Sequence, residues 1–215
     1  MAYKLVIFDL DGTILNTLED LADATNYALA EHDYPLRTIE EVRRFVGNGI
    51  RKLIERAVPA GLTEREIDEV HQTFSGYYQQ HCADKTCPYE GILPLLQRLR
   101  AAGCLTAVVS NKADVAVQPL CRQYYEGLFD YAVGEREGIR RKPAPDAVLE
   151  VLRRLEVDAA DAIYIGDSEV DIQTAANAGL GCIVVTWGFR DRAYLESQGG
   201  RRFVDSPEEI DDMVL

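Results

Sequence analysis

The chain has 215 residues, of which 47% are hydrophobic and 27% charged, an ordinary balance for a globular protein. This length predicts one large domain, or a core with a smaller second unit. The formal net charge of −13 argues against a nucleic-acid-binding protein, because a polyanionic partner usually needs a basic face. The apolar runs are too short for a membrane span or a signal peptide. Without such a signal, the five cysteines predict free thiols and a cytoplasmic location.

Short apolar runs recur along the chain and predict strands that are buried on both faces of a parallel sheet. They lie at residues 4–8, 105–109, 131–133, 162–165 and 182–186. Amphipathic helical patterns separate them at residues 92–102, 147–155 and 170–178, and a short acidic helix is expected at 207–215. Strands that alternate with helices predict an α/β fold with a doubly wound, Rossmann-like parallel sheet.

One long segment interrupts this alternation with helical patterns alone. These patterns cover residues 18–31, 39–45, 50–58 and 63–80. An all-helical block between the first strand and the rest of the sheet predicts an inserted subdomain. We therefore expect a helical insertion at residues 16–83 and an α/β core formed by residues 1–15 and 84–215.

Two aspartates directly follow the first predicted strand. Asp9 and Asp11 leave the strand on the same side, since residues i and i+2 share a face. Two carboxylates held close together need a cation, or one of them must be protonated. Gly12 allows a sharp turn there. Taken alone, the motif is equally typical of a solvated acidic turn in which Thr13 caps a helix.

Further polar groups follow the other predicted strands. Ser110 and Asn111 follow the second, Lys142 precedes a proline after the third, and Asp167 and Asp171 follow the fourth. Each has a plain alternative as a helix cap, a solvated base or an acid at a helix start. However, sites in open α/β sheets form where the carboxyl ends of the strands meet. Oxygen-only ligands suit Mg²⁺, so the set predicts an aspartate nucleophile beside Mg²⁺ and a lysine.

In order and spacing, these elements resemble the motifs of the haloacid-dehalogenase-like superfamily, within its Mg²⁺-dependent phosphatases. The four segments that carry the resemblance are residues 8–13, Ser110-Asn111, Lys142-Pro143, and Gly166-Asp167-Ser168 with Asp171. The helical insertion resembles the cap domain of that family. Residues 46–49 and 88–91 are similar to the phosphoglycolate phosphatase branch.

The resemblance implies a mechanism with a covalent intermediate. Asp9 attacks phosphorus and becomes an aspartyl phosphate, while Asp11 protonates the leaving oxygen and later deprotonates the attacking water. Ser110 and Lys142 hold the transferring phosphoryl group. An acid at position 11 favours phosphate-ester hydrolysis over dehalogenation, because a halide leaves without a proton.

The resemblance also implies how Mg²⁺ is held. Its expected ligands are the Asp9 carboxylate, the backbone carbonyl of Asp11 and Asp167. Asp171 is either a further ligand or a supporting residue that pairs with Lys142.

The expected partner is a small-molecule phosphate ester, with 2-phosphoglycolate first, and the chain is expected to be a monomer or a homodimer. Thr13, Asn111, Gly49 and Arg51 are expected to contact this substrate. Since the core motifs offer no cation beyond those committed to the phosphoryl group, Arg51 is expected to meet a substrate carboxylate. The alternative is that Arg51 is a solvated helix residue.

Two other readings of the function stay open. A sugar phosphomutase, nucleotidase or pyrophosphatase would use the same scaffold and motifs. A non-enzymatic phospho-acceptor signalling domain also combines an acidic pocket with a lysine. The position of Asp9 on the first strand and the helical insertion both count against the signalling domain.

Overall fold

The computed structural model describes residues 3–215, which divide into two compact units. The α/β unit runs up to Leu15 and resumes over Pro88–Leu215, and the helical unit is Asn16–Cys87. The boundary expected after residue 83 therefore lies inside the helical unit. Two short strands, β2 (Leu15–Asn16) and β3 (Cys87–Pro88), pair with each other where the chain passes between the units.

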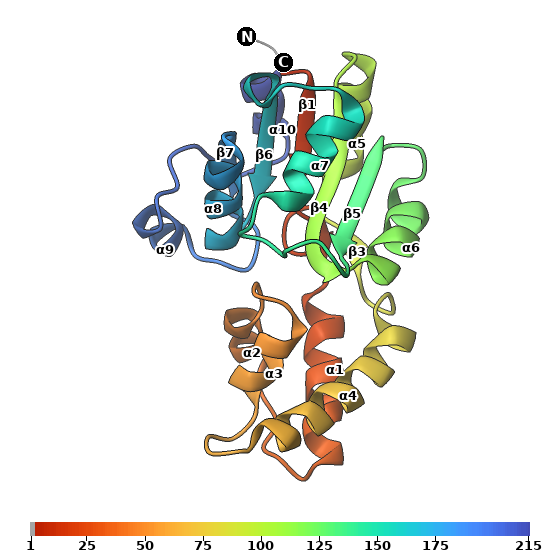
Figure 1. Cartoon of the computed structure of the whole chain (residues 1–215), viewed down its shortest axis with the longest axis vertical. Helices are drawn as coiled ribbons and strands as arrows, with labels where there is room; N and C mark the ends of the chain where they lie inside the picture. Colours follow the sequence, from red (N-terminus) through yellow and green to blue (C-terminus); the bar gives the residue numbers. More distant parts are fainter. Residues whose placement is uncertain (1–2) are drawn as a thin grey trace. The chain divides into compact units, whose positions relative to one another are not determined.

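A parallel sheet forms the α/β unit and confirms the predicted fold class (Figure 1). Its strand order is β5-β4-β1-β6-β7-β8. The strands are β1 (Leu5–Phe8), β4 (Leu105–Ala113), β5 (Tyr131–Glu135), β6 (Ala162–Gly166), β7 (Gly181–Val185) and β8 (Phe203–Val204). Strand β8 was not predicted, because two residues carry no periodic pattern.

Burial on both faces explains the continuous apolar runs of the central strands. All four residues of β1 are fully buried. Leu5 and Ile7 join the hydrophobic cluster that α7 (Asp146–Leu155) and α8 (Glu169–Ala178) form on one face of the sheet. Val6 and Phe8 point to the other face, since side chains alternate along a strand. Strand β1 lies between β4 and β6 in the middle of the sheet. Asp9, the residue after β1, therefore lies at the carboxyl ends of these central strands.

The remaining helices of the α/β unit complete its layers. They are α5 (Ile92–Ala101), α6 (Asp114–Tyr125), α9 (Arg192–Ser197), α10 (Glu208–Val214) and a 3₁₀ turn at Ala159–Asp161. Helices α6 and α9 were not predicted from the sequence. Pro119 lies inside α6, where it disturbs the helical pattern, and α9 has only six residues.

The helical unit contains α1 (Leu18–Glu31), α2 (Ile39–Phe45), α3 (Ile50–Ala57) and α4 (Glu64–His81), close to the four predicted ranges. Capping boxes start two of these helices. The side chains of Thr38 and Thr63 accept hydrogen bonds from the third helical residue, and the glutamates there return them. The apolar faces of the four helices share one hydrophobic cluster, which gives this unit a core of its own.

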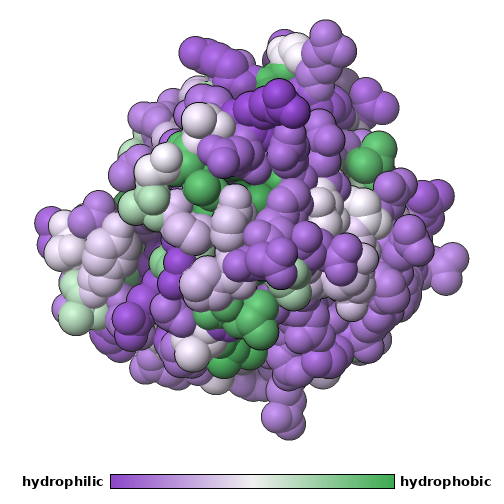
Figure 2. Space-filling view, turned by 90° about the horizontal axis from the view of Figure 1, so that it is seen from below, coloured by the Kyte–Doolittle hydropathy of each residue, from purple (hydrophilic) through white to green (hydrophobic). Residues whose placement is uncertain are grey.

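Within residues 3–215, no helix combines the length and the apolar character that a membrane crossing needs. The face seen in Figure 2 is mostly hydrophilic, with its hydrophobic residues in small separate groups. This face therefore offers no broad apolar surface.

Candidate active site

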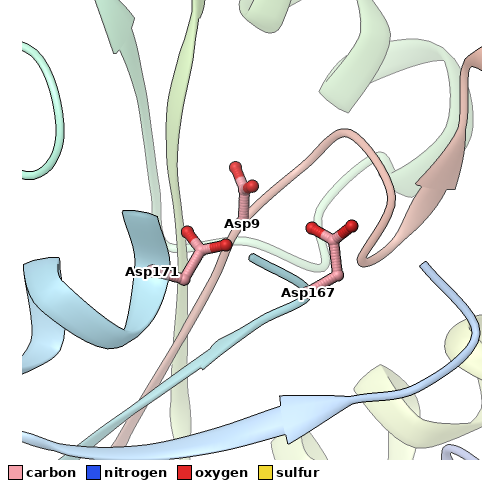
Figure 3. A group of neighbouring side chains, drawn as sticks. All are labelled: Asp9, Asp167 and Asp171. Atoms are coloured by element: carbon pink, nitrogen blue, oxygen red, sulfur yellow. The ribbon is translucent and has the colours of Figure 1, made fainter. Parts of the chain in front are cut away.

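Three carboxylates gather where β1 and β6 end. Asp9 follows β1, Asp167 follows β6, and Asp171 lies in the first turn of α8. Figure 3 shows the three carboxylates grouped together. One oxygen from each lies within 4.8 Å of the others, so the structure brings together three of the carboxylates singled out in the sequence.

Lys142 lies among these carboxylates with its ammonium buried. Its Nζ is 2.8 Å from Asp9 Oδ1, 2.8 Å from Asp171 Oδ1 and 3.0 Å from the hydroxyl of Tyr164. Burial opposes the charge, but Asp171 and Asp9 outweigh it and raise the pKa of Lys142 well above its usual value. The lysine therefore stays a cation beside Asp9.

Asp171 is fully buried and uses both carboxylate oxygens within the protein. Oδ1 accepts hydrogen bonds from Lys142 and Tyr164, and Oδ2 accepts from the backbone N–H and the hydroxyl of Ser168. A metal ion would have to compete with these donors. The arrangement favours the supporting role of Asp171, as the partner of Lys142, over direct ligation.

Two loops fix Asp167. The backbone N–H of Phe189 donates to its Oδ2 at 2.7 Å. A Cβ at Gly12 would lie 2.4 Å from this Oδ2, and one at Gly188 would lie 2.3 Å from Asp167 Cβ, so only glycine fits at either position. Thr13 is fully buried with its Oγ1 3.4 Å from Asp167 Oδ1. The side chain of Thr13 faces Asp167, and its contact with substrate stays a prediction.

Asp11 pairs with Lys112, a contact that was not predicted from the sequence. Lys112 Nζ lies 3.1 Å and 3.3 Å from the two carboxylate oxygens of Asp11, and the lysine side chain is only 3% exposed. The expectation that the core motifs hold no further cation was therefore wrong. The available signal was the spacing, since Ser110 and Lys112 are two residues apart on a strand.

Asn111 supports Lys142. Its Nδ2 donates to the carbonyl of Lys142 at 3.0 Å, and its Oδ1 accepts from the N–H of Lys142 at 2.8 Å. Each end of the amide makes one hydrogen bond to the backbone of Lys142, and a substrate contact of Asn111 stays a prediction. Ser110 is buried, and its Oγ accepts from the N–H of Lys112 at 3.2 Å. Its hydroxyl proton remains a donor to offer a phosphate oxygen.

The two predicted substrate residues of the helical unit lie at the start of α3. Gly49 precedes this helix with φ +83°, a backbone conformation that favours glycine. Arg51 forms ion pairs with Glu55, Glu64 and Asp68 of the same unit. These carboxylates already neutralise the charge of Arg51, and a substrate carboxylate would have to compete with them. The contact of Arg51 with a substrate carboxylate stays a prediction.

The charges at the site leave room for a divalent cation. Burial, followed by the charge of Asp171, raises the pKa of Asp167 to about 7, and burial also raises the pKa of Asp9. If all groups are ionised, two ammonium groups face four carboxylates, which leaves two negative charges unbalanced. The oxygen-only donors and this excess charge fit Mg²⁺.

The raised pKa of Asp167 predicts how the stability of the metal-free protein depends on pH. A carboxyl that titrates near 3.8 when unfolded and at about 7 when folded binds more protons in the native state between these values. The contribution of Asp167 to the free energy of unfolding should therefore fall as the pH rises from about 4 to about 7, by a few kcal/mol. Urea unfolding at several pH values measures this. Asp167→Asn should flatten the slope, and an unchanged slope would contradict the assignment.

Comparisons with known proteins give one consistent family. Residues 6–185 match the family model of the haloacid dehalogenase-like hydrolases. The chain is 36% identical over 200 residues to a phosphoglycolate phosphatase of Mesorhizobium japonicum, covering 89% of this chain and 86% of the relative. It is 31% identical over 216 residues to the N-acetylmuramic acid 6-phosphate phosphatase of Pseudomonas aeruginosa, covering 100% and 96%.

A solved structure agrees with these relatives. A crystal structure from Lactobacillus delbrueckii subsp. bulgaricus, provisionally named phosphoglycolate phosphatase, superposes with a TM-score of 0.96 at 40% identity. The match covers 100% of this chain and 99% of that one. The resemblance to the superfamily and to its phosphoglycolate phosphatase branch is confirmed.

Proposed function

Since the chain belongs to the haloacid dehalogenase-like hydrolase family, we propose that it hydrolyses a small phosphomonoester through an aspartyl phosphate on Asp9. The observation that carries the proposal is the buried group of Asp9, Lys142 and Asp171, with Asp167 beside it. A lysine that contacts the nucleophile also lies close to the phosphorus that this nucleophile attacks. Its charge would stabilise the transferring phosphoryl group.

The first half-reaction makes the covalent intermediate. A carboxylate oxygen of Asp9 forms a bond to phosphorus, and the bond from phosphorus to the ester oxygen breaks. Asp11 gives its proton to that leaving oxygen. Lys142 and the hydroxyl of Ser110 offer hydrogen bonds to the phosphoryl oxygens during the transfer.

The second half-reaction releases phosphate. Asp11, now ionised, accepts a proton from the water that attacks phosphorus, and the bond between phosphorus and Asp9 breaks. Both aspartates return to their starting states. Asp171 and Asn111 hold Lys142 in place through its side chain and its backbone.

Asp9 and Asp167, with the Asp11 carbonyl, would hold Mg²⁺, which would supply positive charge to the phosphoryl oxygens. We expect activity to disappear in EDTA and to return with Mg²⁺. Ca²⁺ should inhibit, since its larger and looser coordination shell would misplace Asp9. Mg²⁺ should also raise the melting temperature near pH 8, where the site carries its excess charge. Full activity in chelator would contradict this proposal.

The substrate we propose first is 2-phosphoglycolate, which is supported by the names of several relatives. The muramic acid phosphatase among the relatives supports a phosphorylated sugar acid as the second candidate. A panel of 2-phosphoglycolate, N-acetylmuramic acid 6-phosphate, a nucleoside monophosphate, pyrophosphate and p-nitrophenyl phosphate tests the proposal through kcat/KM. Absence of turnover on every phosphate in Mg²⁺ would overturn it.

A further inference from the structure

Tyr164 is a fully buried tyrosine of β6 to which the mechanism above gives no role. Its ring belongs to the hydrophobic cluster on one face of the sheet. In the described part of the chain, its hydroxyl has three polar neighbours: the ammonium of Lys142 at 3.0 Å, the carbonyl oxygen of Val109 at 3.1 Å and Asp171 Oδ1 at 3.2 Å. A phenylalanine would fill the same place in the core, so packing alone does not account for the hydroxyl.

The directions of these hydrogen bonds follow from the donors available. An ammonium can only donate, so the oxygen of Tyr164 accepts from Lys142. A tyrosine hydroxyl keeps its proton at neutral pH, and burial raises the pKa of Tyr164 well above its usual value. This one proton is donated to the carbonyl of Val109 or to Asp171. The hydroxyl therefore accepts from Lys142 while its own proton anchors it to the protein.

The three N–H donors of the Lys142 ammonium are matched by three oxygens among residues 3–215. Two of these oxygens, on Asp171 and Tyr164, belong to side chains that are fully buried. The third belongs to Asp9, the proposed nucleophile, whose side chain is 11% exposed. Two donors are therefore held inside the protein, and the remaining donor is directed at the residue that a phosphoryl group must approach.

The elements that carry the two buried oxygens are closely packed. A Cβ at Gly166 would lie 2.3 Å from Cγ of Asp171, so α8 can approach the end of β6 only over a glycine. Tyr164 lies on β6 and Val109 on β4, the two neighbours of the central strand β1. The hydroxyl thus connects β6 to the residue before Ser110, the second side chain expected to bind the phosphoryl group.

We propose that Tyr164 is a positioning residue: its hydroxyl, together with Asp171, orients the Lys142 ammonium so that one donor is directed at Asp9 and the phosphoryl group. Asn111 fixes the backbone of Lys142. A lysine side chain is long and flexible, so a fixed backbone does not by itself fix the ammonium. The inference rests on the proposed function, in which this ammonium stabilises the transferring phosphoryl group.

Tyr164→Phe tests the inference, because it removes the hydroxyl and keeps the ring in the core. The Lys142 ammonium then loses an acceptor and can turn away from Asp9. We expect the rate constant of phosphoryl transfer to Asp9 to fall by about tenfold to hundredfold, as for a lost hydrogen bond to a charged group. Single-turnover release of p-nitrophenol from p-nitrophenyl phosphate, with protein in excess and Mg²⁺ present, measures this rate constant.

The rate constant at saturating protein separates positioning from a purely structural role. Partial unfolding would raise the protein concentration needed for saturation and leave the saturated rate constant unchanged, because only folded molecules react. In the Lys142→Met background, Tyr164→Phe should cause no further slowing, since no ammonium is left to orient. Tyr131→Phe, which removes the hydroxyl that contacts Glu150, is the matched control in the same sheet and should keep the wild-type rate constant.

Three results would overturn the inference. One is a saturated rate constant in Tyr164→Phe equal to that of the wild-type protein. A second is equal slowing by Tyr164→Phe with and without Lys142, since the hydroxyl would then act on something else. A third is slowing of the same size in Tyr131→Phe, which would indicate a general effect of losing a tyrosine hydroxyl from the sheet. Failure of the wild-type protein to hydrolyse any phosphate of the panel would instead count against the proposed function.

Discussion

Replacing Asp9 by Asn is expected to lower kcat for every phosphate ester by roughly four orders of magnitude or more, as loss of a covalent nucleophile does elsewhere. An amide is a very poor nucleophile and cannot form the acyl phosphate. It is also a weaker ligand for Mg²⁺ than a carboxylate. The Asn side chain has nearly the same size, so the packing after β1 should persist.

The structure also predicts the stability of this variant. Burial raises the pKa of Asp9, so the ionised carboxylate is held at a cost in the metal-free protein. Lys142 keeps Asp171 and Tyr164 as partners when Asp9 becomes neutral. We therefore expect the melting temperature of metal-free Asp9→Asn to stay near that of the wild-type protein.

Two measurements check the role of Asp9. Steady-state kinetics compare Asp9→Asn with Asp161→Asn, a partly exposed aspartate that pairs with Lys4 and should leave activity unchanged. Acid-quenched mass spectrometry during turnover should find one added phosphoryl group on the wild-type protein and none on Asp9→Asn. Turnover by pure Asp9→Asn at the wild-type rate would remove Asp9 from the nucleophile role.

The sequence was most informative where structure follows from local patterns. The strand at Leu5–Phe8 was predictable because a strand that is buried on both faces appears in the sequence as a continuous apolar run. The helices after Thr38 and Thr63 were predictable from their helical patterns, and the structure adds a capping box at the start of each. Asp9, Asp167 and Asp171 could be expected to converge, since the ends of neighbouring parallel strands meet at one edge.

The partners of individual polar side chains were not predictable in this way. Asn111 and Thr13 stand beside catalytic motifs, but their side chains bind a backbone and a carboxylate inside the protein. Tyr164 is central in β6, where a tyrosine usually fills the core, and its hydroxyl contacts Lys142, Asp171 and the carbonyl of Val109. These choices depend on tertiary packing and leave no periodic signal.

The backbone contact that the segment after β7 makes with Asp167 was also not predictable from the sequence. The N–H of Phe189 holds Asp167, and Gly188 lets the chain come close enough to do so. A backbone N–H is common to all residues except proline, so the sequence carries no mark of which one is used. Only the glycine hinted at a close approach.

Replacing Asp11 by Asn is expected to slow both half-reactions, and to slow them unequally for different esters. General acid and base catalysis is typically worth about 10²- to 10⁴-fold. An amide can neither donate the proton to the leaving oxygen nor accept one from water. Its carbonyl oxygen can still accept a hydrogen bond from Lys112, so the buried ammonium keeps an acceptor and the fold should survive.

The leaving group separates the two roles of Asp11. p-Nitrophenolate is a stable anion and needs little protonation, whereas the alkoxide of 2-phosphoglycolate needs a proton as it departs. In single-turnover experiments, Asp11→Asn should form the aspartyl phosphate from p-nitrophenyl phosphate at nearly the wild-type rate, and from 2-phosphoglycolate far more slowly. Hydrolysis of the intermediate should be slow in both cases, because the same water must be activated. A burst of p-nitrophenol followed by slow turnover would display this directly. Equal losses of phosphorylation on both esters would show instead that Asp11 acts by charge or position, through its contact with Lys112, and not by proton transfer.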